Sequence, residues 1–267
     1  SAGRNPRPPR LLSPPPETVR SFRSSVTRKP RTQNEIVEGV TAETRKPSVL
    51  VFDVNETLID IDALAPVFDG LFGDPRVLRE WFGQLVMYSM TVTMSGSYVD
   101  FFTLGRSVLR MLGDVHGVAV GSDDLKRLAQ SMATMPAHPD VADGLTALAD
   151  RGYRLVTLTN SPPSAGAPTP LENAGLAGHF ERQFSVDTFG VFKPTTRLYT
   201  GVAAELGVMP TDCMMVAAHI WDTMGAQAAG MSAAFIARPG NAVLPVDPLP
   251  PPTLVATDLI ELAGLLT

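Results

Sequence analysis

The sequence is poor in the residues that build disulfides and cysteine-ligated metal sites. Its 267 residues include one cysteine, which excludes an internal disulfide and a cysteine-based zinc site. The four histidines are scattered and show no zinc-motif spacing. No apolar run reaches about 18 residues, so the sequence offers no candidate membrane span. These absences indicate a globular protein of a reducing compartment, and we expect a cytoplasmic location with no membrane partner.

Basic residues are fewer than acidic ones, and ten of the 22 lie within the first 47 positions. The chain carries 22 basic and 27 acidic residues, a formal net charge of −5, which argues against nucleic acid as a partner. Residues 1–47 hold ten basic and four acidic residues, eight prolines and almost no apolar periodicity. We therefore predict a disordered, basic, proline-rich tail over residues 1–47. A transit peptide has a similar composition and stays an alternative.

Short apolar runs alternate with helical segments through the rest of the chain. The runs span residues 49–52, 155–158, 184–186, 214–217 and 233–236. The helical segments lie near residues 140–150, 167–175, 195–206 and 222–230. Apolar runs of this length are typical of parallel strands buried on both faces of a sheet. The alternation predicts an α/β fold with a doubly wound parallel sheet.

One long interval breaks this alternation. About 100 residues separate the first two apolar runs, and they contain no convincing strand. Amphipathic stripes predict helices near residues 63–72, 77–93, 98–113 and 122–134. We predict a helical cap over residues 61–135, inserted into a core domain made of residues 48–60 and 136–267. A second proline cluster, residues 245–252, is expected to form a loop before a short last helix.

Polar residues stand where the predicted strands end. In chain order they are Asp53 and Thr57, Thr159 and Asn160, Lys193, and His219 and Asp222. Because the carboxyl ends of parallel strands meet at one edge of a sheet, we expect these side chains to lie close together. A carboxylate attacks best when it is ionised and removed from bulk water, and a nearby lysine would keep Asp53 ionised. The pattern therefore predicts a nucleophile site.

The order of these motifs resembles that of the haloacid dehalogenase superfamily. The matching segments are Phe52-Asp53-x-x-x-Thr57-Leu58, Leu158-Thr159-Asn160, Lys193-Pro194, and Trp221-Asp222-x-x-Gly225-Ala226. The run from Phe192 to Tyr199 and the run from Trp221 to Ala226 are similar to the type II 2-haloacid dehalogenases. The resemblance implies a Rossmann-like core with a helical cap. It also implies a hydrolase that converts a small 2-haloacid to a 2-hydroxy acid through an aspartyl ester.

The same resemblance implies roles for individual residues. As catalytic residues we expect Asp53, Thr57, Lys193, Asp222 and His219. As substrate-binding residues we expect Thr159, Asn160, Phe82, Tyr199 and Trp221. Two positions differ from the dehalogenase pattern, because Phe82 stands where an arginine is usual and His219 where an asparagine is usual. His219 could position the hydrolytic water and act as a base, or it could merely cap the helix that follows.

Dehalogenation and phosphate-ester hydrolysis need different residues beside the nucleophile. The phosphatases of the superfamily have a second acid two residues after the nucleophile, and here that position is Asn55. A halide leaves without a proton, so dehalogenation needs no such acid. We therefore expect no metal and no cofactor, with Mg²⁺ required only if the protein is a phosphatase or phosphonate hydrolase instead. A non-catalytic binding protein on the same fold is the other alternative, and a homodimer is left open.

Overall fold

The computed structural model describes residues 46–163, 166 and 168–266, and these belong to one compact unit, residues 43–267. The predicted tail lies outside the described residues except for its last two positions. Six parallel strands form one sheet in the order β3-β2-β1-β4-β5-β6. They are β1 (Val49–Phe52), β2 (Arg154–Thr159), β3 (Arg182–Ser185), β4 (Cys213–Ala217), β5 (Ser232–Ile236) and β6 (Leu254–Ala256). The predicted parallel α/β sheet is confirmed.

Strand β1 occupies the centre of the sheet. All four of its side chains are fully buried, because β2 and β4 cover its two edges and helices cover its faces. Phe52 lies in register with Thr157 of β2 and with Val216 of β4. The strand order reverses between β1 and β4, which is where open α/β sheets bind their ligands. Asp53 and the residues after β4 therefore meet at this edge.

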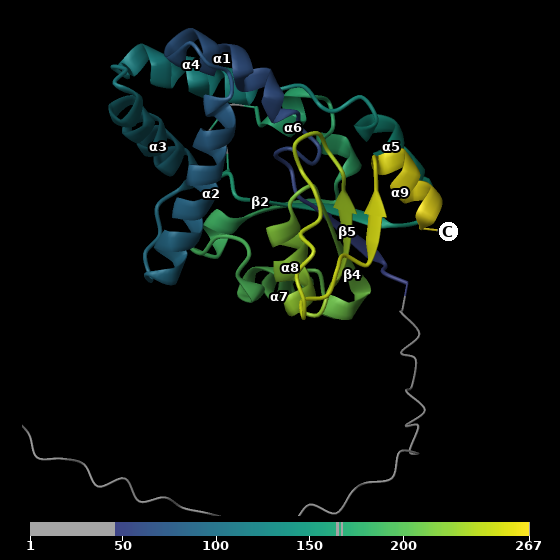
Figure 1. Ribbon diagram of the computed structural model, residues 1–267. Helices are drawn as coiled ribbons and strands as arrows, with labels where there is room; N and C mark the ends of the chain where they lie inside the picture. The colour runs from purple at the N-terminus through teal and green to yellow at the C-terminus, as the bar shows by residue number, and fades with distance from the viewer. Residues whose placement is uncertain (1–45, 164–165, 167, 267) are drawn as a thin grey trace, which may run out of the picture. The chain divides into compact units, whose positions relative to one another are not determined.

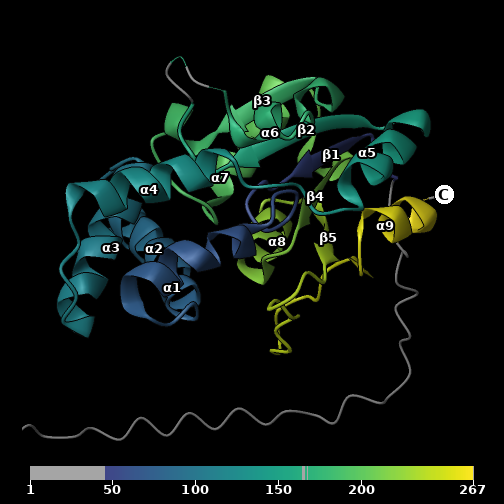
Figure 2. The same cartoon turned by 90° about the horizontal axis from the view of Figure 1, so that it is seen from above.

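Helices cover both faces of the sheet. They are α5 (Val141–Asp150), α6 (Pro170–Asn173), α7 (Thr196–Glu205), α8 (Ile220–Ala228) and α9 (Leu259–Leu265). Helix α5 packs with α9 and α7 with α8, and the two pairs lie on opposite sides of the sheet (Figures 1 and 2). Helix α6 is shorter than predicted because Thr169 caps it and it ends after one turn. Strand β6 was not predicted, since its apolar run Leu254-Val255-Ala256 is only three residues long and Val255 is half exposed.

Four further helices lie between β1 and α5 and gather beside the sheet, as Figure 1 shows. They are α1 (Ala65–Phe72), α2 (Val77–Met94), α3 (Phe101–His116) and α4 (Ser122–Ala133). The expected helical insertion is confirmed, while its limits at residues 61–135 stay a prediction. Helix α3 begins later than predicted, because Asp100 caps it by accepting the backbone N–H of Thr103 at 2.9 Å. No helix in the described part of the chain is long and apolar enough to cross a membrane.

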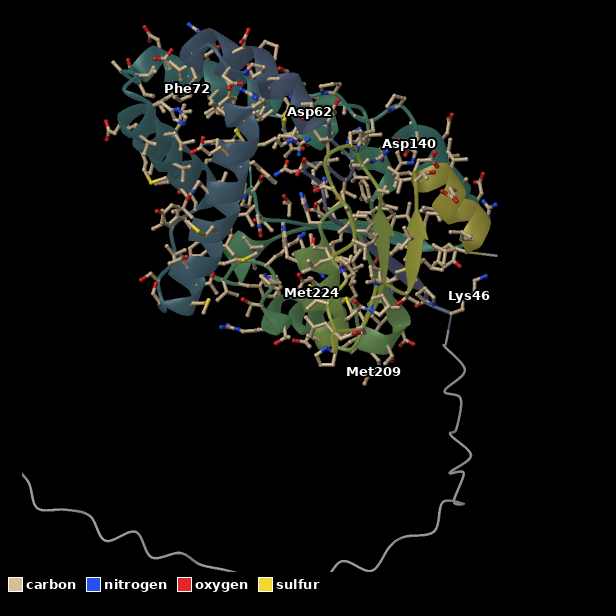
Figure 3. All side chains as sticks on the ribbon, in the orientation of Figure 1. Lys46, Asp62, Phe72, Asp140, Met209 and Met224 are labelled. Carbon is tan, nitrogen blue, oxygen red and sulfur yellow. The ribbon has the colours of Figure 1, made fainter. Side chains whose placement is uncertain are left out.

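The two segments that lead into and out of the helical insertion are joined to each other. Ile59 forms an antiparallel bridge with Ala137. The backbone N–H of Asp60 donates to the carbonyl of Pro136 at 2.8 Å, and that of His138 donates to the carbonyl of Leu58 at 3.0 Å. Figure 3 shows Asp62 where the chain leaves the sheet for the helices, with Phe72 farther out in the helical group. These bonds fix the loop after Asp53 from both sides.

Gly225 lets helix α8 approach the loop that follows β3. A Cβ atom at this position would lie 2.6 Å from Cβ of Pro194 and 2.9 Å from the ring of Tyr199. Backbone and a buried ring cannot move aside cheaply in a close-packed interior. The absence of a side chain at residue 225 therefore helps to place Lys193, which precedes Pro194.

We predict that Gly225→Ala destabilises the protein by about 1–3 kcal/mol, the usual cost of overpacking a core. The matched control is Gly264→Ala in α9, where no atom lies within 4 Å of the new Cβ. That change should leave stability equal or slightly raised, since alanine favours helices over glycine. Urea unfolding of both variants checks the prediction, and equal stabilities would contradict it.

Candidate active site

Asp53 is the central group of the site. It follows β1 directly, is only 5% exposed, and its backbone N–H donates to the carbonyl of Val216 at 3.0 Å. Lys193 Nζ donates to its Oδ1 at 3.0 Å, and Thr57 Oγ1 donates to its Oδ2 at 2.8 Å. The Thr57 oxygen in turn accepts the backbone N–H of Ala218 at 2.9 Å. The structure thus brings two predicted residues, Thr57 and Lys193, to the carboxylate of Asp53.

Lys193 lies between two buried carboxylates. Its Nζ also donates to Oδ2 of Asp222 at 2.7 Å, and all three side chains are nearly or fully inaccessible. Burial is the largest effect and would raise the pKa of Asp53, but the charges and hydrogen bonds of Lys193 and His219 together outweigh it and hold that pKa well below its usual range. Burial would lower the pKa of Lys193, but Asp222 and Asp53 raise it. Asp53 is therefore ionised, and the ammonium neutralises it without any added ion.

Asp222 and Tyr199 support Lys193 from behind. The Tyr199 hydroxyl donates to Oδ1 of Asp222 at 2.6 Å, and both side chains are fully buried. Burial raises the pKa of Asp222, and burial together with the Asp222 charge raises the pKa of Tyr199, which remains a donor. With both of its oxygens occupied, Asp222 holds Lys193 in place. The predicted contact of Tyr199 with the substrate stays a prediction.

The residues after β2 form the next wall of the site. Asn160 Oδ1 accepts the backbone N–H of Lys193 at 3.4 Å, which ties this turn to the lysine loop. The Thr159 hydroxyl accepts the backbone N–H of Ser161 at 3.1 Å. Asn55 Nδ2 donates to the Ser161 hydroxyl at 3.4 Å. Asn55 thus contributes an amide at the position where the rival chemistry would need an acid.

His219 lies on the other side of Asp53. Its Nδ1 is 3.2 Å from Oδ2 of Asp53, and its Nε2 is 2.6 Å from Oε2 of Glu56. Burial would lower its pKa, but the hydrogen bonds and charges of these two carboxylates raise the pKa of His219 to about 9. The residue occupies the N-cap position of α8, yet its side chain makes no capping hydrogen bond. The structure thus favours a role in the site over the capping alternative.

Two predicted aromatic residues enclose the His219 ring. Trp221 stacks on it with the two ring centroids 4.8 Å apart. The ring of Phe82, on α2, is tilted relative to the imidazole, and the two ring centroids lie 5.6 Å apart. Phe82 is almost fully buried. Phe82 was predicted to contact the substrate from the cap. The structure places its ring beside His219, and not only among the apolar residues of the helical insertion. Its uncharged ring faces the imidazole.

Glu56 also lies in this site, although no sequence motif pointed to it. It is 3% exposed and has a φ of 64°, a left-handed conformation that is uncommon for residues other than glycine. Besides His219 it binds Arg79 of α2, whose guanidinium also donates to Asp62 at 2.8 Å. Burial would raise its pKa, but His219 and Arg79 lower it. The only sequence signal was an acid between Asp53 and Thr57, which carries little information by itself.

A cavity of about 530 Å³ adjoins the site. It reaches Asn55, Thr159 and Ser161 at the strand ends, and Trp81 and Phe101 contribute to its apolar wall. Asp53 itself is not among its lining residues, although both Val54 and Asn55 are. Within residues 46–163, 166 and 168–266, no group of three or more histidine, cysteine or acidic side chains is arranged to hold a metal ion.

Comparison with known proteins gives a consistent family. Residues 47–230 match the family described as haloacid dehalogenase-like hydrolase. The (S)-2-haloacid dehalogenase of Xanthobacter autotrophicus is 30% identical over 195 residues, which cover 71% of this chain and 74% of that protein. The (S)-2-haloacid dehalogenase of Pseudomonas fluorescens is 25% identical over 219 residues, or 81% and 95% of the two chains.

Solved structures agree with the sequence matches. The L-2-haloacid dehalogenase from Xanthobacter autotrophicus with chloropropionic acid covalently bound superposes with a TM-score of 0.72. The two chains are 25% identical, and the match covers 82% of this chain and 98% of that one. The shared fold includes the sheet and the helices beside it.

The raised pKa of His219 predicts a pH dependence of stability. A group whose pKa is higher in the folded protein stabilises it fully below the unfolded value of about 6.5 and loses this contribution as pH rises through the folded value. The free energy of unfolding should therefore fall as pH rises from about 6.5 through about 9. Urea unfolding at several pH values across this range should show that the free energy of unfolding falls less with pH in His219→Asn than in the wild type. An equal fall in both proteins would contradict the raised pKa of His219.

Proposed function

The chain belongs to the haloacid dehalogenase-like hydrolase family, and on this premise we propose that it hydrolyses a small 2-haloacid to the 2-hydroxy acid. The observation that carries the proposal is the buried contact of Lys193 with Asp53, which holds an ionised carboxylate out of bulk water at the ligand-binding edge of the sheet. Such a carboxylate is an effective nucleophile. The covalent chloropropionic acid in the related Xanthobacter structure supports the same step.

In the first step Asp53 attacks C2 of the substrate from the side opposite the halogen. Its Oδ1 accepts one hydrogen bond and its Oδ2 two, so Oδ1 is the freer nucleophile. The new bond joins Oδ1 to C2, and the carbon–halogen bond breaks with its electron pair leaving on the halide. The product of this step is an ester of Asp53 with inverted configuration at C2.

In the second step water attacks the ester carbonyl carbon. The bond from this carbon to Oδ1 breaks, one proton of the water ends on the alkoxide, and the other is released from the regenerated carboxyl group. The product is a 2-hydroxy acid, and Asp53 is ionised again. We assign the orientation of this water to Lys193, which Asp222 holds beside the ester.

Residues around Asp53 bind the rest of the substrate in this proposal. Thr159 and Asn160, at the end of β2, provide polar groups for the substrate carboxylate. Phe82 and Trp221 provide apolar rings on the other side. No step requires a metal or a cofactor, because Lys193 supplies the positive charge beside the nucleophile.

The proposal predicts halide release that survives EDTA. Purified protein is incubated with 2-chloropropionate, 2-bromopropionate and p-nitrophenyl phosphate, with and without EDTA, and halide and phosphate are measured. Asp53→Asn should abolish halide release, because an amide oxygen is a poor nucleophile. Asp150→Asn, at the exposed end of α5, is the matched control and should release halide normally.

Two outcomes would contradict the proposal. Phosphate release that EDTA abolishes would identify a metal-dependent phosphatase. Release of neither ion by the folded protein would favour a non-catalytic binding protein.

A further inference from the structure

His219 is held by two carboxylates in a way that fixes the direction of both ring nitrogens. Nδ1 faces Oδ2 of Asp53 at 3.2 Å, and Nε2 faces Oε2 of Glu56 at 2.6 Å. A carboxylate only accepts hydrogen bonds, so both nitrogens must carry a proton for both bonds to exist. The stacked Trp221 ring and the Phe82 ring prevent the imidazole from turning away. The ring is therefore an imidazolium with Nδ1–H aimed at Asp53.

The second carboxylate is itself held in place. Glu56 is buried, adopts a φ of 64°, and forms an ion pair with Arg79, which also binds Asp62. A left-handed φ is strained at a residue with a side chain, and it persists only where the surroundings impose it. The His138 ring also bonds the Glu56 carbonyl at 3.0 Å. Position 56 thus carries a glutamate although glycine would be less strained at this φ.

The atom that His219 faces becomes important in the second step. When Oδ1 forms the ester, Oδ2 remains as the carbonyl oxygen, and negative charge develops on it when water adds. Thr57 Oγ1 and His219 Nδ1 both already lie within hydrogen-bond distance of Oδ2. Two donors aimed at the oxygen that gains charge are the geometry of an oxyanion hole.

We propose that Glu56 is a positioning residue that holds His219 with Nδ1–H directed at Oδ2 of Asp53, so that His219 and Thr57 form the oxyanion hole for hydrolysis of the Asp53 ester. This inference rests on the proposed function. In this role His219 keeps its proton throughout and stabilises charge rather than removing a proton from water. Glu56 touches neither substrate nor ester and acts only through the imidazolium.

The charged surroundings of His219 set the expected pH dependence. Asp53 and Glu56 face the ring directly, Lys193 and Arg79 pair with those two carboxylates, and Asp222 lies beyond Lys193. The faces covered by α2 and α8 present the uncharged rings of Phe82 and Trp221. Ester formation removes the Asp53 charge and leaves Glu56 as the only carboxylate on the ring. Hydrolysis of the ester should therefore slow as pH rises and His219 loses its proton.

The test follows the ester itself on the full chain. Enzyme in excess is mixed with 2-bromopropionate, quenched at intervals, and the alkylated protein is measured by intact mass. In Glu56→Gln the ester should form at nearly the wild-type rate and decay about tenfold more slowly, since losing one oxyanion donor entirely costs about 10²–10³. The falling pH limb of the decay should also move to lower pH, because a neutral amide stabilises the imidazolium less than a carboxylate does.

Matched variants separate this role from simple damage to the fold. Asp123→Asn removes an exposed carboxylate that pairs with Lys126 within α4, away from His219, and it should leave ester decay unchanged. Glu56→Gly relieves the left-handed φ and so folds readily, yet it removes the acceptor and should slow decay at least as much as glutamine does. In parallel, NMR of ¹⁵N-labelled histidine should show both His219 nitrogens protonated at neutral pH in the wild type, with a lower pKa in Glu56→Gln.

The outcomes distinguish this inference from the proposed function. An ester that never forms on the wild type would overturn the proposed function and this inference with it. An ester that forms but decays equally fast in the wild type and in Glu56→Gln would overturn the inference alone. A decay rate that rises with pH would assign His219 as a general base and would also overturn it.

Discussion

The site depends on one buried contact, the ammonium of Lys193 between the carboxylates of Asp53 and Asp222. An isolated charge buried in a protein costs several kcal/mol, so none of these groups would stay ionised without the others. The contact also ties together the loop after β1, the loop after β3 and the first turn of α8, which follows β4. Charge and geometry are therefore set by the same bonds, and the nucleophile is held ionised before any substrate arrives.

A second layer of charge extends from this centre into the helical insertion. His219 joins Asp53 to Glu56, and Arg79 of α2 joins Glu56 to Asp62. The layer reaches from the end of β4 to a helix that belongs to the predicted cap. Phe82 and His219, the two positions that differ from the dehalogenase pattern, have rings in contact with each other. The two positions therefore share one contact beside Asp53.

Much of the centre could be predicted from sequence because its signals are local. Each of the segments that carry Asp53, Lys193 and Asp222 can be recognised from its own residues. A parallel sheet brings the carboxyl ends of its strands to one edge, so these side chains are expected to meet. Glu56 had no such signal, because its partners lie 23 and 163 residues away. The resemblance indicated Tyr199 as a site residue, but the bond of its hydroxyl to Asp222 could not be predicted, because that partner lies 23 residues away. Strand β6 was missed because its apolar run is only three residues long, too short to distinguish a strand from a loop.

The central claim is that Asp53 becomes covalently bonded to the substrate. It is tested most directly by a single turnover in water enriched in ¹⁸O, with enzyme in excess over 2-bromopropionate. The account predicts that the label appears first in the carboxylate of Asp53, located by mass analysis of the peptide that contains it, and that the 2-hydroxy acid is unlabelled. Label in the 2-hydroxy acid on that first turnover would show direct attack by water and would contradict the account.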